Sequence, residues 1–151
     1  MKIGDKIPAV LGKDQNGKEI KASDFTGKKL VLYTYPKDNT SGCTAEACSL
    51  RDNKDALAEK GYVILGVSKD SAASHQRFIE KQGLNFDLIA DTETTLLQEL
   101  GAWGEKKMCG KTTIGTLRTT YIVDENGVIT NIFTPKQIKT AEHAQQILEV
   151  L

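Results

Sequence analysis

Residues 30–48 read LVLYTYPKDNTSGCTAEAC, and this stretch predicts the central part of the fold. Its first six residues favour a strand that ends at Pro36, because proline cannot donate a hydrogen bond to a sheet. Polar residues typical of a loop follow, and Thr40 or Ser41 among them can cap a helix. Residues 43–60 are rich in alanine, leucine and glutamate and precede a glycine, so they predict a helix with a cysteine in its first turn.

Strand and helix patterns continue to alternate along the rest of the chain. Apolar runs predict strands at residues 63–68, 86–90, 119–123 and 128–133. Helical patterns predict helices at residues 71–82, 92–100 and 140–151. Residues 10–20 have the pattern of a hairpin around an Asn-Gly turn.

This order of elements predicts an α/β protein with a thioredoxin-like fold. The first two of these strands, residues 30–35 and 63–68, are almost continuously apolar, which fits a sheet covered on both faces. A cysteine where the first of them leads into its helix is typical of the thioredoxin-like arrangement. We therefore expect a central mixed β-sheet flanked by helices, with an N-terminal β-hairpin, in a single domain of residues 1–151.

The composition and the N-terminal sequence indicate which partners and which cellular compartment to expect. The chain has 151 residues, with 20 basic and 20 acidic side chains and a formal net charge of zero. This balance gives no electrostatic reason to expect nucleic acid or an anionic membrane as a partner. The N-terminus has no apolar core of signal-peptide length, and no stretch approaches the roughly 20 apolar residues of a membrane helix. A cytoplasmic location is expected, where free thiols stay reduced unless they are in use.

The position of Cys43 favours nucleophilic chemistry. Backbone N–H groups and the helix dipole at a helix N-terminus favour a negative charge, and the thiolate is the nucleophilic form of cysteine. The alternative is a buried structural cysteine that happens to begin a helix. The helix position alone leaves both interpretations open.

The residues around this cysteine resemble the active-site motif of peroxiredoxins. The motif Pro-x-x-x-Thr-x-x-Cys is formed by Pro36, Thr40 and Cys43. Residues 42–52, GCTAEACSLRD, are similar to the Q-type subgroup, whose members are also called bacterioferritin comigratory proteins. The resemblance runs nearly end to end, and it includes Asp24-Phe25-x-Gly27, Tyr35-Pro36-Lys37, residues 103–106 (WGEK) and residues 118–124 (RTTYIVD).

The resemblance implies a role for each matching residue. Cys43 is the expected peroxidatic cysteine, which attacks one peroxide oxygen and becomes a sulfenic acid. Thr40 is expected to direct its hydroxyl to the thiolate and the peroxide, and Pro36 to shield the sulfur from water. Arg118 is expected beside the sulfur, where a permanently charged guanidinium stabilises a thiolate and holds a peroxide oxygen. The alternative for Arg118 is an ordinary surface residue of a strand.

Cys48 resembles the resolving cysteine of the subgroup. Five residues of helix advance about 7.5 Å and leave two side chains about 140° apart, whereas a disulfide needs Cα atoms within about 7 Å. Oxidation is therefore expected to unwind the first turns of the helix that begins at Cys43. The alternative for Cys48 is a core cysteine. Glu46, in the same helix, either relays protons or positions the loop, or is an acid favoured by the helix dipole.

The chain departs from the family's pattern at one position and has further residues that could carry chemistry. Many peroxiredoxins have a proline at the position of Ser41. The serine makes the loop less stiff, because it does not restrict the backbone as proline does. Cys109 lies in a polar stretch that is typical of a loop, and it is either a spectator thiol or an alternative resolving thiol. His75 and His143 lack metal-ligand spacing and are expected on helix surfaces. Trp103 is expected to pack in the core or near the active-site loop.

The sequence thus predicts a peroxidase that reduces hydrogen peroxide and organic hydroperoxides, with a role in antioxidant defence. The resemblance implies recycling by thioredoxin, no cofactor, and a monomer as the sufficient unit. A protein thiol–disulfide oxidoreductase is the first alternative, although its usual motif is Cys-x-x-Cys. A redox sensor that uses the same cysteines, and a zinc site, are the others.

Overall fold

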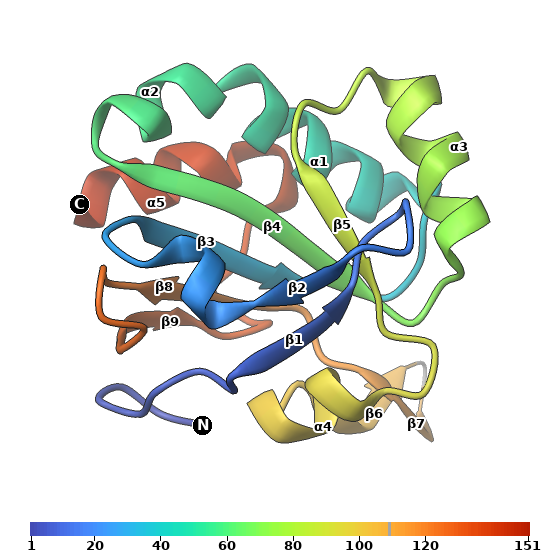
Figure 1. Ribbon diagram of the computed structural model, residues 1–151. Helices are drawn as coiled ribbons and strands as arrows, with labels where there is room; N and C mark the ends of the chain where they lie inside the picture. Colours follow the sequence, from blue (N-terminus) through green and yellow to red (C-terminus); the bar gives the residue numbers. More distant parts are fainter. Residues whose placement is uncertain (109) are drawn as a thin grey trace.

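The computed structural model in Figure 1 describes residues 1–108 and 110–151, and a five-stranded mixed sheet forms its centre. The strand order is β5 (Asp87–Ala90), β4 (Tyr62–Ser68), β3 (Lys29–Thr34), β8 (Thr119–Val123) and β9 (Ile129–Phe133). Strand β3 is parallel to β4 and antiparallel to β8. Strand β4 is also parallel to β5, and β9 pairs antiparallel with β8. The predicted α/β class and mixed sheet are confirmed.

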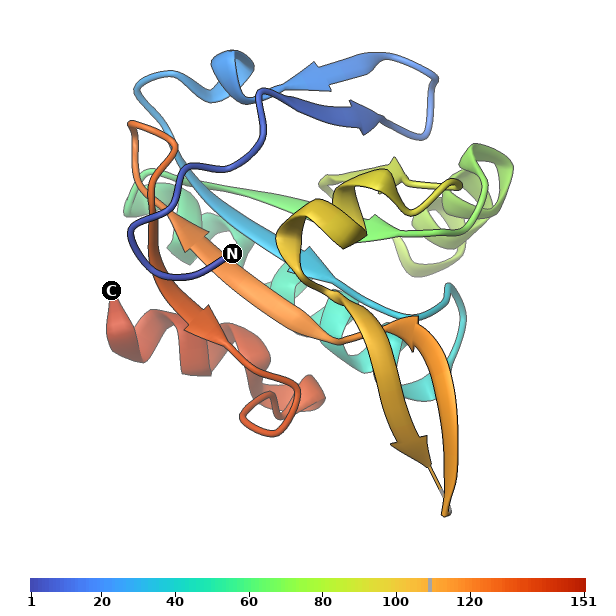
Figure 2. The same cartoon turned by 90° about the horizontal axis from the view of Figure 1, so that it is seen from below.

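Helices and a hairpin cover the two faces of this sheet (Figures 1 and 2). One face packs against α1 (Ser41–Asp52), α2 (Lys54–Glu59), α3 (Ala72–Gln82) and α5 (His143–Val150). The other face packs against α4 (Thr95–Leu100) and the N-terminal hairpin of β1 (Val10–Lys13) and β2 (Glu19–Lys21). Alternate residues of β3 divide between these layers, because successive strand side chains point to opposite faces. The predicted N-terminal hairpin is confirmed.

Helix boundaries differ from the sequence-based expectation at three places. The helix expected at residues 43–60 is interrupted at Asn53, whose side-chain amide donates to the carbonyl of Ser49 at 2.8 Å. Helix α4 begins later than expected, since Thr94 adopts a left-handed φ of 60°. The last helix is preceded by a 3-10 turn, η2 (Thr140–Glu142). A second 3-10 turn, η1 (Ala22–Phe25), follows β2.

Residues 103–108 and 111–116 form the strands of a second hairpin, whereas a loop is expected over the polar stretch 106–111. Strands β6 (Trp103–Met108) and β7 (Lys111–Thr116) pair antiparallel and extend away from the sheet (Figure 2). Most of β7 is exposed, so its pairing needs no apolar alternation that a sequence pattern could reveal. Cys109 lies outside the described residues. Trp103, as expected, packs against the core, in the layer that contains α4.

The expectation that His75 and His143 lie on helix surfaces is wrong. Both imidazoles are fully buried. His75 lies three residues before Phe78, and His143 lies four residues before Ile147, so each histidine shares a helix face with an apolar core residue. This spacing was the available signal in the sequence.

Candidate active site

Cys43 lies at the point where the central sheet meets the first helix. Strand β3 ends at Thr34, a loop follows, and Cys43 is the third residue of α1. Its thiol is 1% exposed and packs in the apolar layer between the sheet and the helices. The sulfur is thus withdrawn from bulk water beside a helix N-terminus, which favours an anion.

Arg118 contacts this sulfur from a distant part of the chain. Its Nη2 donates to Cys43 Sγ at 3.2 Å, and its Nη1 donates to Glu46 Oε1 at 2.6 Å. The register of the sheet explains the meeting, because Thr34 pairs with Thr119 and Arg118 therefore precedes β8 next to the end of β3. One guanidinium thus bridges the thiol and a carboxylate.

Glu46 is the buried member of this group. It lies one helical turn after Cys43, and its side chain is fully inaccessible. Its Oε2 has no hydrogen-bond partner among the described residues and lies 3.8 Å from Nε2 of His143. Burial raises the pKa of Glu46 to about 7, although the charge and hydrogen bond of Arg118 oppose the shift.

His143 does not offer Glu46 a proton. Its Nδ1 faces Gln146 Oε1 at 3.0 Å, and that oxygen only accepts, so Nδ1 carries the hydrogen. Its Nε2 lies 2.7 Å from the hydroxyl of Thr120, from which it accepts. Burial lowers the pKa of His143, which keeps the imidazole neutral. The unpartnered Glu46 oxygen is therefore consistent with the raised pKa of that carboxyl.

The other residues expected in the site lie in the loop and along α1. Thr40 is the residue before α1, but its hydroxyl donates to the carbonyl of Lys37 at 3.1 Å and does not cap the helix. Pro36 is partly buried at the start of the same loop. Cys48 is partly exposed, and its Sγ lies 3.7 Å from Gln82 Oε1 on α3. Cys43 and Cys48 are both free thiols on one uninterrupted helix.

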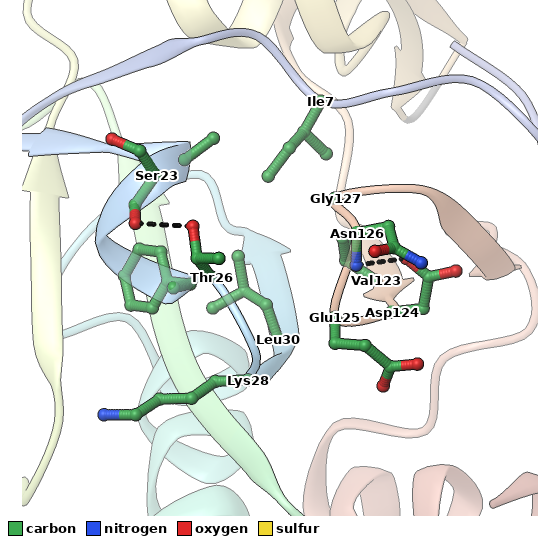
Figure 3. Close-up of a pocket in the computed structure, with 12 residues that line it drawn as sticks. Ile7, Ser23, Thr26, Lys28, Leu30, Val123, Asp124, Glu125, Asn126 and Gly127 are labelled. Atoms are coloured by element: carbon green, nitrogen blue, oxygen red, sulfur yellow. Dashed lines mark hydrogen bonds between the residues drawn. The ribbon is translucent and has the colours of Figure 1, made fainter.

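A pocket drawn in Figure 3 is distant from this group. Its lining includes Leu30 and Val123, which pair at the beginning of β3, whereas Cys43 follows the end of that strand. Among residues 1–108 and 110–151 there is no cluster of three or more histidine, cysteine, aspartate or glutamate side chains suited to a metal ion. Within the same residues, no helix has the length and apolar character to span a bilayer.

The Glu46 pKa predicts a stability that depends on pH. A carboxyl whose pKa rises from 4.5 to about 7 on folding stabilises the fold below pH 4.5, and this stabilisation is lost as the pH rises through 7. Two proteins are compared, Cys43→Ser as the parent and Cys43→Ser with Glu46→Gln. Between pH 4.5 and 8, the unfolding free energy of the parent should fall by on the order of 3 kcal/mol relative to that of the Glu46→Gln protein. Urea unfolding across this range measures the difference.

The exposed Glu149 of α5 supplies the control for this measurement. Glu149→Gln in the same background retains Glu46, so its unfolding free energy should fall with pH as the parent's does, and the difference between the two should stay constant from pH 5.5 to 8. A constant difference between the parent and Glu46→Gln from pH 4.5 to 8 would contradict the raised pKa of the buried carboxyl.

Comparison with known proteins gives consistent results across the chain. Residues 3–132 match the model of the AhpC/TSA family. Peroxiredoxin Bcp of Bacillus subtilis is 40% identical over 151 residues, which are 100% of this chain and 95% of the relative. Peroxiredoxin Bcp of Escherichia coli is 39% identical over 151 residues, which are 100% of this chain and 96% of the relative.

Solved structures show the same fold. Mutants of peroxiredoxin Q from Xanthomonas campestris and Xylella fastidiosa superpose with TM-scores of 0.88 and 0.89. Each is 32% identical and matches 99% of this chain, with 97% and 94% of the respective solved chain covered. A bacterioferritin comigratory protein from Xanthomonas campestris, described for its alkyl peroxide reduction activity, has a TM-score of 0.87 at 31% identity, over 99% of this chain and 96% of its own. The chain therefore belongs to the AhpC/TSA family, as a peroxiredoxin of the Q or Bcp type.

Proposed function

We propose that this protein is a thiol-dependent peroxidase that reduces hydrogen peroxide and organic hydroperoxides at Cys43. The observation that carries this proposal is the guanidinium of Arg118, whose Nη2 lies 3.2 Å from the sulfur. A fixed positive charge at this distance favours the thiolate and can hold the peroxide as its O–O bond breaks. The relative with alkyl peroxide reduction activity supports the same substrate class.

In the first step the Cys43 thiolate attacks one oxygen of the hydroperoxide. An S–O bond forms as the O–O bond breaks, and the other oxygen leaves and takes a proton to become an alcohol or water. The sulfur, oxidised by two electrons, becomes a sulfenic acid. Thr40 exchanges its hydrogen bond with the Lys37 carbonyl for one with the thiolate and the peroxide, and Pro36 shields the sulfur from water. Glu46 holds the guanidinium of Arg118 in place through the 2.6 Å hydrogen bond.

In the second step Cys48 resolves the sulfenic acid. Its thiol attacks the Cys43 sulfur, water leaves, and an intramolecular disulfide forms. A dithiol reductant, which we take to be thioredoxin, returns both thiols. Because both cysteines lie on one helix, a monomer is sufficient for the cycle. The resulting role is antioxidant defence and redox homeostasis in the cytoplasm.

The second step requires a change in α1. The two cysteines are five residues apart in one helix, where their side chains are separated by about 140° around the axis. The contacts that hold this segment include Cys48 with Gln82 and the hydrogen bond from the Ala144 N–H to Ser49 Oγ at 3.1 Å. We therefore expect the segment from Cys43 to Leu50 to leave its helical conformation on oxidation.

Thiol mapping tests the reaction. One equivalent of hydrogen peroxide added to the reduced protein should remove two hydrogens and link Cys43 to Cys48, as read by intact mass and peptide mapping. Cys43→Ser should abolish the reaction, and Cys48→Ser should accumulate a sulfenic acid that a dimedone-type trap captures. Slow oxidation of Cys43 would contradict the peroxidase proposal, and a link to Cys109 would move the resolving role to that thiol.

Amide exchange tests the change in α1. In the disulfide form, the amides from Cys43 to Leu50 should exchange much faster than in the reduced form, because their helical hydrogen bonds are lost. The amides of α3 before its last turn serve as an internal control and should keep their protection, because Gln82, which contacts Cys48, lies at the end of α3. Equal protection of the Cys43–Leu50 amides in both redox forms would show that the disulfide forms without unwinding.

A further inference from the structure

The loop between β3 and α1 rests on a buried carboxylate that the proposed mechanism does not use. Asp38 lies in the middle of this loop, two residues after Pro36 and two before Thr40, and it is only 5% exposed. Buried carboxylates are rare unless they are paired and hydrogen-bonded. The groups that bind the Asp38 carboxylate therefore also fix the position of the loop.

Three side chains donate hydrogen bonds to this carboxylate. The hydroxyl of Tyr35 lies 2.6 Å from Oδ1, the hydroxyl of Ser74 lies 2.8 Å from Oδ2, and Nδ1 of His75 lies 2.7 Å from Oδ2. Tyr35 follows β3, whereas Ser74 and His75 lie in the first turn of α3. The carboxylate thus joins the active-site loop, which follows β3, to the helix that follows β4.

His75 carries a hydrogen on each ring nitrogen when it is paired with an ionised Asp38. Its Nε2 lies 2.9 Å from the carbonyl oxygen of Ile89 on β5, and a carbonyl oxygen only accepts, so Nε2 is protonated. Its Nδ1 faces a carboxylate oxygen, which also accepts. Burial would raise the pKa of Asp38, but the hydrogen bonds from His75 and Tyr35 and the charge of His75 outweigh burial and lower it. The two residues form a buried ion pair.

The backbone of the loop is held at the same residue. The N–H of Asp38 donates to Asp70 Oδ2 at 2.6 Å, and Asp70 lies in the connection between β4 and α3. The next residue, Asn39, has a φ of 64°, a left-handed conformation that is uncommon outside glycine although asparagine adopts it more readily than most residues. Such a conformation persists when its surroundings hold it, and here both the side chain and the main chain of Asp38 do so.

We propose that Asp38 and His75 are positioning residues for peroxide reduction, because their ion pair fixes the loop that carries Pro36 and Thr40 beside Cys43. Neither residue touches the sulfur or the substrate, and both act through the loop. This inference rests on the proposed function. A displacement of about 1 Å at a reacting group can lower a rate by as much as about a hundredfold, so a loosened loop should slow the reaction with peroxide.

Two rates measured on Cys43 test the inference. In a Cys48→Ser background, the rate constant for oxidation by hydrogen peroxide is compared with the rate of alkylation by iodoacetamide. Oxidation needs the geometry of the loop, whereas alkylation needs only an accessible thiolate. Asp38→Asn and His75→Gln should each lower the oxidation rate about tenfold or more without lowering the alkylation rate. The double variant should be no slower than the slower single variant, since both substitutions break one pair.

Two further variants separate positioning from general stability. Tyr121→Phe removes another buried hydrogen bond, the 2.7 Å contact with the carbonyl of Leu100 in the opposite layer, and should lower the melting temperature without slowing oxidation. Ser74→Ala removes one donor to Asp38 and leaves the ion pair intact. It should fold, and it should slow oxidation less than the pair variants do.

The outcomes distinguish a failure of the positioning role from a failure of the proposed peroxidase function. The positioning role would be overturned if folded Asp38→Asn and His75→Gln were oxidised within twofold of the parent rate. It would also be overturned if Tyr121→Phe lost as much of the oxidation rate as these variants, or if their alkylation rate fell in parallel with their oxidation rate. If the pair variants do not fold, an oxidation rate for Ser74→Ala equal to the parent rate would overturn it. Slow oxidation of the parent protein itself would contradict the proposed function.

Discussion

Arg118 lies between the Cys43 sulfur and the buried carboxyl group of Glu46, and the proposed chemistry depends on this one guanidinium. Its two terminal nitrogens divide between the partners, with Nη2 at 3.2 Å from the sulfur and Nη1 at 2.6 Å from Glu46 Oε1. A carboxylate with no access to water would be strongly destabilised without a cation beside it. Glu46 in turn keeps the guanidinium in one orientation, so that it can act on the sulfur.

The sheet brings Arg118 to two residues that lie 72 and 75 positions before it in the sequence. Antiparallel pairing of β3 with β8 sets Arg118 next to the end of β3, and the first two turns of α1 supply Cys43 and Glu46. The apolar strand at the centre of the sheet therefore has two roles. It forms the core, and its end fixes the register on which the contact between Arg118 and Cys43 depends.

The sequence predicted the parts of the fold that have strong local signals. The apolar runs, the helix that carries Cys43 and the N-terminal hairpin gave elements close to those observed. Periodicity could not find the β6–β7 hairpin, because its strands pair with each other and β7 is largely exposed. The resemblance to peroxiredoxins pointed to Arg118, although no local pattern places that residue near a cysteine 75 positions away. The contacts of Asp38 with His75 join the loop after β3 to the helix after β4, and only the tertiary structure reveals them.

The central claim is that the charge of Arg118 makes Cys43 a fast nucleophile towards peroxide. The most direct measurement is the rate constant for oxidation of Cys43 by hydrogen peroxide, in a Cys48→Ser background, for the parent, Arg118→Lys and Arg118→Met. Loss of the guanidinium in Arg118→Met should lower the rate by about a hundredfold or more, and Arg118→Lys should recover only part of it, because lysine keeps the charge but not the two-pronged geometry. An Arg118→Met protein that is folded and is oxidised at the parent rate would contradict the account.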